Sequence, residues 1–143
     1  MNTLEIASRL THLKCFKGVY PKDLLPQKVY KERPIAFVIN TDKSDKPGEH
    51  WVALVIDKNN IAEYFDSFGF SPICCEIRSL LFKNKISSIT YNKYQIQSYL
   101  SLTCGVYCIL YIEMRCNNSS FRQFINLFSD NHLMNDYLVT KLI

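Results

Sequence analysis

The chain has 143 residues, of which 48% are hydrophobic and 21% are charged, and its formal net charge is +4. This length predicts a single domain over residues 1–143 that can bury a core without disulfides or a metal. So small a positive charge does not indicate a dedicated nucleic-acid-binding protein. The sequence shows neither a leader-like N-terminus nor an apolar run of about 18 residues. We therefore expect no membrane partner and a location inside a cell or within a particle.

The N-terminal part predicts a helix, an irregular segment and a strand. The helix is expected over residues 3–13, where Asn2 and Glu5 have the spacing of a capping box. Residues 16–34 hold three prolines and one glycine, which is typical of irregular surface chain. The β-branched, apolar run at 34–40 predicts a buried strand.

A hairpin is predicted in the middle of the chain, with strands at 50–57 and 61–68 around the turn at 58–60. The later expected elements are a helix at 71–82, strands at 85–92 and 94–97, a helix at 104–116 that is apolar nearly all round, and two short closing helices, the first at 121–128. Helices at both ends with several strands between them predict an α+β fold.

Six cysteines are spread through the sequence, but no CxxC pair occurs, and the three histidines lie far apart. This pattern does not indicate a zinc site, so we expect no metal. Because no leader indicates secretion, a disulfide framework is not expected either, and most thiols are predicted to be reduced and buried.

Cys104 stands at the start of the apolar helix, directly after a loop. A helix N-terminus favours the thiolate, which is the reactive form of cysteine. Gly105 follows it and is expected to leave room for a substrate chain. The alternative is that Cys104 only packs in the interior, as Cys108 and Cys116 are expected to do.

His50 begins a predicted strand after a polar turn, a position that suits a general base because the strand fixes the ring. The alternative is an ordinary surface histidine. Trp51 beside it could shield a site from water, or could simply pack in the core. The hairpin would bring Asp66 back toward His50, where a carboxylate orients the imidazole. Asp57 is expected at the far end of the hairpin, Asp45 in a loop and Glu63 on the other strand face.

Gln97 could donate a side-chain N–H to a developing oxyanion, together with the backbone N–H of Cys104. Gln95 would lie on the same face of an extended strand. Strand phase therefore does not choose between the two glutamines.

Four separated motifs occur in order: His50-Trp51, an acid followed by x-Phe-Gly-Phe-Ser at 66–71, a glutamine, and Cys-Gly seven residues after it. The stretches GEHWVALVIDKNNIAEYFDSFGFS and QSYLSLTCGVYCILY that carry them resemble the adenovirus maturation protease (adenain) family. That family is related to the SUMO- and ubiquitin-like-protein proteases. The likeness covers roughly residues 12–116.

The resemblance implies roles for four residues: Cys104 as nucleophile, His50 as base, Asp66 as the acid that orients it and Gln97 as oxyanion donor. The spacing to Cys104 selects Gln97 over Gln95. It also implies a papain-like α+β fold with the nucleophile on a central helix packed on a mainly antiparallel or mixed sheet. Small residues before the cut, typically glycine, are expected.

No cofactor is required by this resemblance, although family members can be activated by a peptide or by DNA. The position for a disulfide-tethered peptide falls near Ile86, where this chain has no cysteine. Three lysines, Lys83, Lys85 and Lys93, give weak support for DNA stimulation.

The sequence therefore predicts a monomeric viral-type cysteine endopeptidase that cleaves virion or capsid precursor proteins, in an infected cell or in the virion. Its origin could be a virus distantly related to adenoviruses or a virus-like transposon. One alternative is a protease for ubiquitin- or SUMO-like modifiers. A second is a non-catalytic descendant that binds a capsid or nucleic-acid partner.

Overall fold

A five-stranded sheet forms the centre of the molecule, and the computed structural model describes all residues from 1 to 143. The strands lie in the order β1-β2-β3-β4-β5, with β1 at Phe16–Pro21, β2 at Ile35–Asn40, β3 at Trp51–Ile56, β4 at Ala62–Phe65 and β5 at Ile89–Tyr91. The inner pairs β2–β3 and β3–β4 are antiparallel, whereas β1–β2 and β4–β5 are parallel. The sheet is thus mixed, which confirms the α+β prediction.

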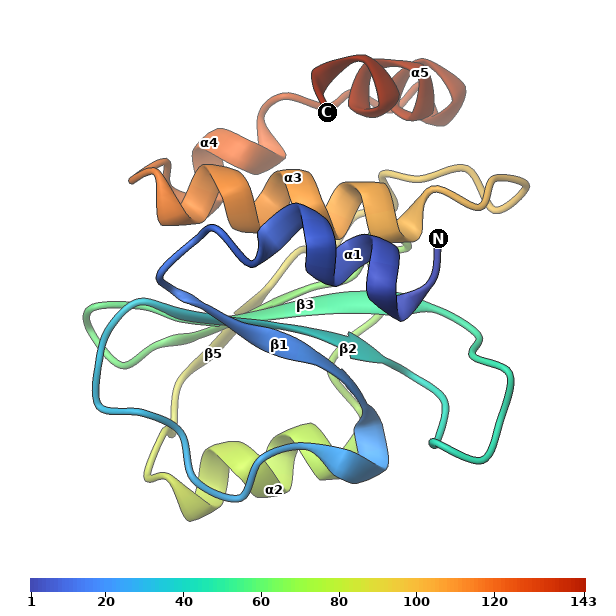
Figure 1. Cartoon of the computed structure of the whole chain (residues 1–143). Coiled ribbons are helices and arrows are strands. Elements are labelled where there is room, and N and C mark those ends of the chain that lie inside the picture. Colours follow the sequence, from blue (N-terminus) through green and yellow to red (C-terminus); the bar gives the residue numbers. More distant parts are fainter.

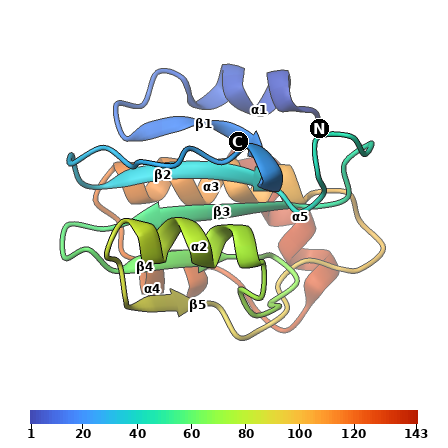
Figure 2. The same ribbon diagram turned by 90° about the horizontal axis from the view of Figure 1, so that it is seen from below.

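Helices cover both faces of this sheet. The chain forms α1 at Thr3–Leu10, a short 3-10 helix at Lys22–Leu24, α2 at Cys75–Lys83, α3 at Cys104–Cys116, α4 at Phe121–Ile125 and α5 at His132–Leu142. Helices α1, α3, α4 and α5 lie on one face and α2 alone lies on the other (Figure 1). Seen from below, α2 lies in front of the strands with α3, α4 and α5 behind them (Figure 2).

The three inner strands β2, β3 and β4 are buried almost throughout, because both faces of the sheet meet helices there. Alternate residues such as Val38 and Ala53 pack toward α3, whereas Phe37 and Leu54 pack toward α2. The sheet therefore separates two apolar cores. Helix α3, which lies over β3, is held in place by the larger of the two.

The prediction of an irregular segment at 16–34 is wrong for its first part, because Phe16–Pro21 pairs with β2 as the edge strand β1. Gly18, at a φ of +130°, falls where the register shifts between Phe16 and Val19. Glycine tolerates that backbone conformation at little cost, so the strand can bulge there without losing its pairing. Of the residues that suggested irregular chain, Gly18 lies at this bulge and Pro21 at the end of the strand.

The predicted strand at 94–97 does not form. The backbone N–H groups of Ile96 and Gln97 both donate to the carbonyl oxygen of Ser67, at 2.8 and 2.9 Å. Two donors on one acceptor cannot continue a strand ladder. The predicted strand at 85–92 shortens to β5, and the predicted helix at 71–82 begins only at Cys75.

The first helix is capped as predicted, since Asn2 and Glu5 form a capping box. The residues that this helix buries are not all those that its apolar spacing suggests. Ile6 and Leu10 are fully buried, whereas Leu4 is 80% exposed. Ile6 and Leu10 together anchor α1 in the core that it shares with α3.

One disulfide joins Cys15, just before β1, to Cys116, the last residue of α3, with the Cα atoms 6.2 Å apart. The expectation of reduced thiols is therefore wrong for this pair. The other four cysteines are free, but only Cys108 is buried; Cys75 is exposed, and Cys74 and Cys104 are half-buried. No helix has the length and apolar content needed to span a bilayer.

Candidate active site

Cys104 is the first residue of α3 and is half-buried at the edge of a cleft. Thr103 occupies the N-cap position, but its side chain makes no capping hydrogen bond. A threonine there would normally accept a bond from an N–H group in the first helical turn. Those N–H groups therefore remain available beside the Cys104 sulfur.

His50 comes directly before β3, and the sheet holds its backbone. Its carbonyl oxygen accepts a hydrogen bond from the Thr41 N–H at 2.9 Å, which extends the β2–β3 pairing by one step. The ring is stacked on Phe68 with a centroid distance of 4.5 Å. Ring nitrogen Nε2 lies 2.7 Å from Oδ1 of Asp66. This bond leaves Nδ1 to face the thiol.

Asp66 follows β4, and the register confirms that the hairpin returns it to the His50 end of the pair, since Ala53 lies opposite Phe65. Asn92 fixes its backbone from both sides: its Oδ1 accepts from the Asp66 N–H at 3.0 Å, and its Nδ2 donates to the Asp66 carbonyl at 2.5 Å. The carboxylate also accepts a bond from the Phe68 N–H at 2.8 Å. The acid is thus both buried and rigidly held.

Gly69 closes the turn that carries Asp66, because its N–H donates to the Asp66 carbonyl at 2.8 Å. Its φ is +77°, and a Cβ there would lie 2.5 Å from backbone atoms of Tyr94. Both constraints require glycine at this position.

The three rival acids are bound or placed elsewhere. Glu63 receives two bonds from the Arg115 guanidinium, each at 2.7 Å, and one from the Tyr111 hydroxyl at 2.6 Å. Asp57 accepts backbone bonds within the turn at the other end of the hairpin. Asp45 is exposed in the loop between β2 and β3. None of them reaches the His50 ring.

Gln97 is fully buried and lies at the wall of the cleft. The Ser67 hydroxyl donates to its Oε1 at 2.5 Å, which sets the orientation of the amide. Its Nε2 donates to the carbonyl and the hydroxyl oxygen of Ser101, each at 3.0 Å. Gln95 instead donates to the Gln97 carbonyl at 3.0 Å and does not line the cleft. Only Gln97 stands beside Cys104.

Burial by itself would raise the pKa of the Cys104 thiol, but several contacts outweigh it and lower that pKa. They are a hydrogen bond to His50, backbone N–H groups of Trp51 and Gly105, and the charge of the His50 ring. Burial would likewise lower the pKa of His50, yet the bonds to Asp66 and Cys104 raise it to about 9. Both shifts favour a thiolate beside an imidazolium.

Cys108 gives the internal comparison, one helical turn further along α3. Burial raises the pKa of its thiol, and the charges of Cys104 and Asp66 add to the effect. A fully buried thiol of this kind stays protonated and unreactive.

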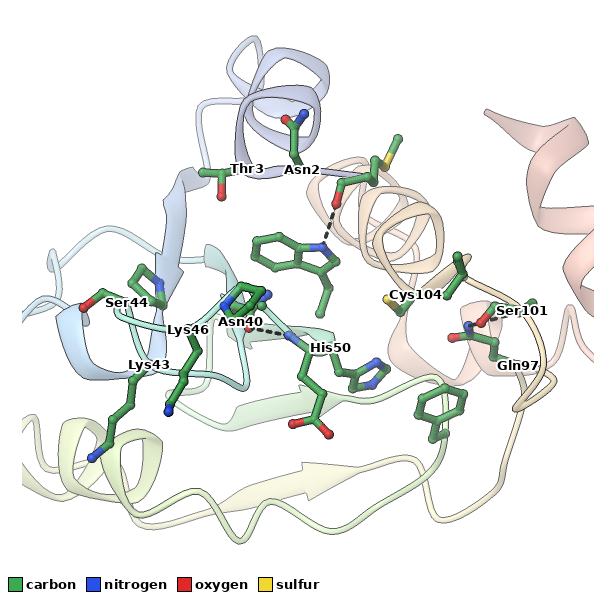
Figure 3. Close-up of a pocket in the computed structure, with 18 of the residues that line it drawn as sticks. Asn2, Thr3, Asn40, Lys43, Ser44, Lys46, His50, Gln97, Ser101 and Cys104 are labelled. Atoms are coloured by element: carbon green, nitrogen blue, oxygen red, sulfur yellow. Dashed lines mark hydrogen bonds between the residues drawn. The ribbon is translucent and has the colours of Figure 1, made fainter.

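The cleft beside Cys104 has a volume of about 540 Å³. His50, Gln97, Ser101 and Cys104 border one side of it, and Lys43, Ser44 and Lys46 border the other (Figure 3). Trp51 is half-buried and also lines the cleft, and its indole N–H donates to the Met1 carbonyl at 3.1 Å.

The expected role of Gly105 in making room for a substrate is not what the structure shows. Gly105 does not line the cleft, and a Cβ there would lie 3.2 Å from the Met1 side chain and 3.3 Å from Ile6. Its lack of a side chain lets the N-terminal segment and α1 pack against α3. Its backbone N–H, by contrast, does face the Cys104 sulfur.

Sequence reasoning missed the residues that hold these groups in place. Ser67, Asn92 and Ser101 contact Gln97 or Asp66, and Asn135 and Asp136 of α5 bind Ile96 and Ser98, the residues on either side of Gln97. Ser67 and Ser101 lie within the motif stretches, whereas Asn92, Asn135 and Asp136 gave no signal, because isolated polar residues have no spacing of their own. No cluster of histidine, cysteine and carboxylate side chains is arranged to hold a metal ion.

Comparison of the sequence with known proteins finds one matching family and several relatives. A family model described as adenovirus endoprotease matches residues 16–139. A cysteine protease of African swine fever virus is 37% identical over 99 residues, which is 62% of this chain and 36% of that protein. The protease of Bovine adenovirus C serotype 10 is 27% identical over 115 residues, 71% of this chain and 58% of that protein. The matched part of the swine fever virus protein is thus little more than a third of its length.

Among solved structures, a crystal structure of the African swine fever virus protease has 30% identity and a TM-score of 0.47, covering 73% of this chain and 43% of that one. The central domain of an uncharacterized Legionella pneumophila protein has a TM-score of 0.54 at 12% identity, covering 99% of this chain and 97% of that domain. The second likeness concerns the fold alone.

Proposed function

Since this chain belongs to the adenovirus endoprotease family, a family of cysteine proteases, we propose that it is a cysteine endopeptidase that works through Cys104, His50, Asp66 and Gln97. The observation that carries the proposal is the position of His50. Its ring bonds Asp66 at 2.7 Å on one side and faces the Cys104 thiol on the other, and the pKa of His50 is raised while the pKa of Cys104 is lowered.

In the proposed reaction, the Cys104 thiolate attacks the carbonyl carbon of the scissile peptide bond. The electron pair of the C=O bond moves to oxygen, and the new oxyanion accepts hydrogen bonds from the Cys104 N–H and Gln97 Nε2. When the intermediate collapses, the C–N bond breaks and the His50 imidazolium gives its proton to the leaving amine. A water molecule, deprotonated by His50, then hydrolyses the thioester and restores the thiolate.

Gln97 takes part only if it exchanges a partner. Both of its amide hydrogens are bonded to Ser101 in the free enzyme. One of these bonds gives way to the oxyanion when substrate enters, while Ser67 continues to hold Oε1. The exchange replaces one hydrogen bond by a stronger, charge-assisted one.

As substrates we propose precursor proteins of virions or capsids, cut after small residues. The support is the family membership and the viral origin of the relatives. Trp51 and Phe68 line the cleft close to His50, and a glycine-containing backbone passes most easily between aromatic walls. The chain is proposed to act as a monomer, in an infected cell or within the virion.

A second candidate is cleavage of SUMO-like modifiers, because a relative from another African swine fever virus isolate, 36% identical over 99 residues, is named a SUMO-1 cysteine protease. The two candidates use the same site and differ in the substrate. A modifier protease requires a docking surface for a folded partner, whereas a precursor protease needs only an extended peptide.

Activation by DNA, or by a peptide that is not disulfide-linked, remains part of the proposal. Ile86, at the position where relatives would tether a peptide, is buried in the core beneath α2. A disulfide-linked activator is therefore not proposed. Lys83, Lys85 and Lys93 are exposed and could contact DNA.

The experiment that tests the function compares three substrates at equal enzyme concentration. These are a fluorogenic peptide ending in two glycines, a SUMO-derived and a ubiquitin-derived fluorogenic protein, each with and without DNA. Faster cleavage of the short peptide supports the precursor protease. A SUMO substrate cleaved at least about tenfold better would favour the modifier protease. No cleavage and no labelling of Cys104 by a thiol-reactive probe would reject both.

A further inference from the structure

The loop 98–103 connects Gln97 to Cys104 and thereby carries the two proposed oxyanion donors at its ends. Three residues at its tip and rim, Tyr99, Leu100 and Leu102, are 59%, 93% and 91% exposed. Tyr99 packs against the rings of Phe68 and Phe70, with centroid distances of 5.1 and 6.4 Å, but Leu100 and Leu102 gain little from apolar packing. The rest of the loop is held by polar contacts, and these lead to helix α5.

Helix α5 forms hydrogen bonds at both ends of this loop. Asn135 donates to the carbonyl oxygen of Ile96 at 3.0 Å, just before Gln97. Asp136 accepts the Ser98 N–H through Oδ2 at 3.3 Å and the Thr103 hydroxyl through Oδ1, also at 3.3 Å. One carboxylate thus joins the first and the last residue of the loop.

A hydrogen-bonded series runs from Gln97 to the same carboxylate. Gln97 Nε2 donates to the Ser101 hydroxyl at 3.0 Å, the Ser101 and Thr103 hydroxyls share a bond of 2.9 Å, and Thr103 donates to Asp136. Hydroxyl groups in series polarise one another, so an anionic acceptor at the end strengthens every bond in it. Besides Ser67, which holds Oε1, a residue of α5 therefore contributes to the position of Gln97 Nε2.

The same contact explains why Thr103 does not cap α3. Its hydroxyl is held by Ser101 and Asp136 and makes no bond to the helix. The first backbone N–H of α3 with a helical partner is that of Tyr107, which donates to the Thr103 carbonyl at 3.1 Å. The N–H of Cys104, the first residue of α3, has no partner within the helix and is free for the oxyanion.

We propose that Asp136 is a positioning residue for the reaction: by binding Ser98 and Thr103 it fixes the loop 98–103 and so places the two oxyanion donors at the ends of that loop. This inference rests on the proposed protease function for its catalytic part. Its structural part, the restraint of the loop by Asp136, is independent of that function.

The test uses Asp136→Asn in the full chain, with Asp130→Asn as the matched control. The replacement amide is nearly isosteric, but its NH2 group faces the Ser98 N–H if its oxygen keeps the bonds to Thr103 and Tyr107. Two donors then meet at the start of the loop. Asp130 carries the same charge six positions earlier and is exposed, so its variant controls for the loss of charge.

We expect Asp136→Asn to lower kcat by about 10- to 10²-fold, with KM changed less than about twofold, since a small displacement of a donor affects the transition state more than the bound substrate. Labelling of the Cys104 thiol should be unchanged. Thr103→Val should show the same loss of kcat, and Thr103→Ser, which keeps the hydroxyl, should restore most of it. Asp130→Asn should match the wild type.

The variant Tyr107→Phe distinguishes the proposed positioning role of Asp136 from a merely structural role. The Tyr107 hydroxyl donates to Asp136 at 2.8 Å and ties α3 to α5 without touching the loop. If Asp136 only held the two helices together, Tyr107→Phe would lower kcat as much as Asp136→Asn at an equal loss of Tm. We expect its effect on kcat to be at least several-fold smaller.

The restraint of the loop by Asp136 is tested by amide hydrogen exchange, a measurement that does not depend on catalytic activity. Peptides covering residues 98–106 should exchange faster in Asp136→Asn than in Asp130→Asn, while peptides from β2 and β3 should not differ. Unchanged exchange in this loop, or an unchanged kcat in an otherwise active enzyme, overturns the role of Asp136. If Cys104→Ala cleaves as well as the wild type, the proposed function fails, and the exchange measurement still decides whether Asp136 holds the loop.

Discussion

The Ser67 hydroxyl donates to Oε1 of Gln97 at 2.5 Å, across a separation of 30 residues in the sequence. The carbonyl of the same serine accepts the backbone N–H groups of Ile96 and Gln97. Because Ser67 follows Asp66 directly, the acid and the proposed oxyanion amide belong to one hydrogen-bonded unit. The bonds between Ser67 and residues 96–97 therefore fix the position of Asp66 relative to Gln97.

Gln97→Ala should lower kcat by about 10²–10³-fold, because the transition state loses a side-chain donor to the oxyanion. Binding of substrate and labelling of Cys104 should be largely unaffected. Gln95→Ala is the control, and its rate should stay within about threefold of the wild type, since its amide contacts only the Gln97 carbonyl. Steady-state kinetics on one peptide substrate decide the matter. A strongly lowered kcat in Gln95→Ala, together with a near-normal kcat in Gln97→Ala, would assign the role of oxyanion donor to Gln95 instead.

Asp66→Asn should keep the fold and lower kcat by between about tenfold and 10⁴-fold, the upper figure being the cost of the same exchange in a serine protease triad. The new amide presents an N–H to Nε2 of His50 and so favours the wrong tautomer. Asp57→Asn, at the other end of the hairpin, should be nearly silent in the same assay. The opposite ranking of the two variants would show that Asp66 does not orient the base.

The activity should decline above a pH of about 9, because the raised pKa of His50 sets the alkaline limit of the charged pair. Removing the carboxylate in Asp66→Asn should move this limit to lower pH. The same shift affects stability: the charged ring stabilises the fold fully below pH 6.5, and that contribution is lost as the pH rises from 6.5 to about 9. A kcat/KM profile with an alkaline limb near pH 6.5 in the wild type would contradict the assigned pair.

A mild reductant should lower the Tm without lowering the specific activity at 25 °C. The Cys15–Cys116 disulfide closes a loop with a sequence separation of 101. A loop of that size corresponds to about 4.7 kcal/mol in the chain-entropy model, an upper figure in practice. The double variant Cys15→Ser/Cys116→Ser should show the lowered Tm with no further response to reductant. Loss of activity on reduction of the double variant would point to another disulfide with a functional role.

The sequence predicted the elements whose signal is local. The capping box of Asn2 and Glu5, the buried run of β2 and the hairpin that returns Asp66 to His50 each follow from spacing along a short stretch. It failed where long-range contacts decide the outcome. Residues 94–97 alternate like a strand, but their backbone donors bind Ser67, and β1 exists because β2 lies beside it.

The same division holds for the candidate site. The four proposed catalytic groups carry a motif order, so the resemblance selected them before the fold was known. Gly105 also belongs to that motif, yet it is constrained by Met1 and Ile6 and not by the cleft. Asn92 and Asp136 carry no motif, since each matters only through the segment that the fold brings next to it.

The central claim, that Cys104 is the nucleophile, is tested most directly by the cleavage rates of Cys104→Ala and Cys108→Ala on the same glycine-containing peptide. Both variants should first give the circular dichroism spectrum of the wild type. Cys104→Ala should then show only background cleavage, because the thiolate is gone. Cys108→Ala should keep most of its rate, because that thiol is buried and its pKa is raised. Equal loss in both variants, or substantial cleavage by Cys104→Ala, would contradict the claim.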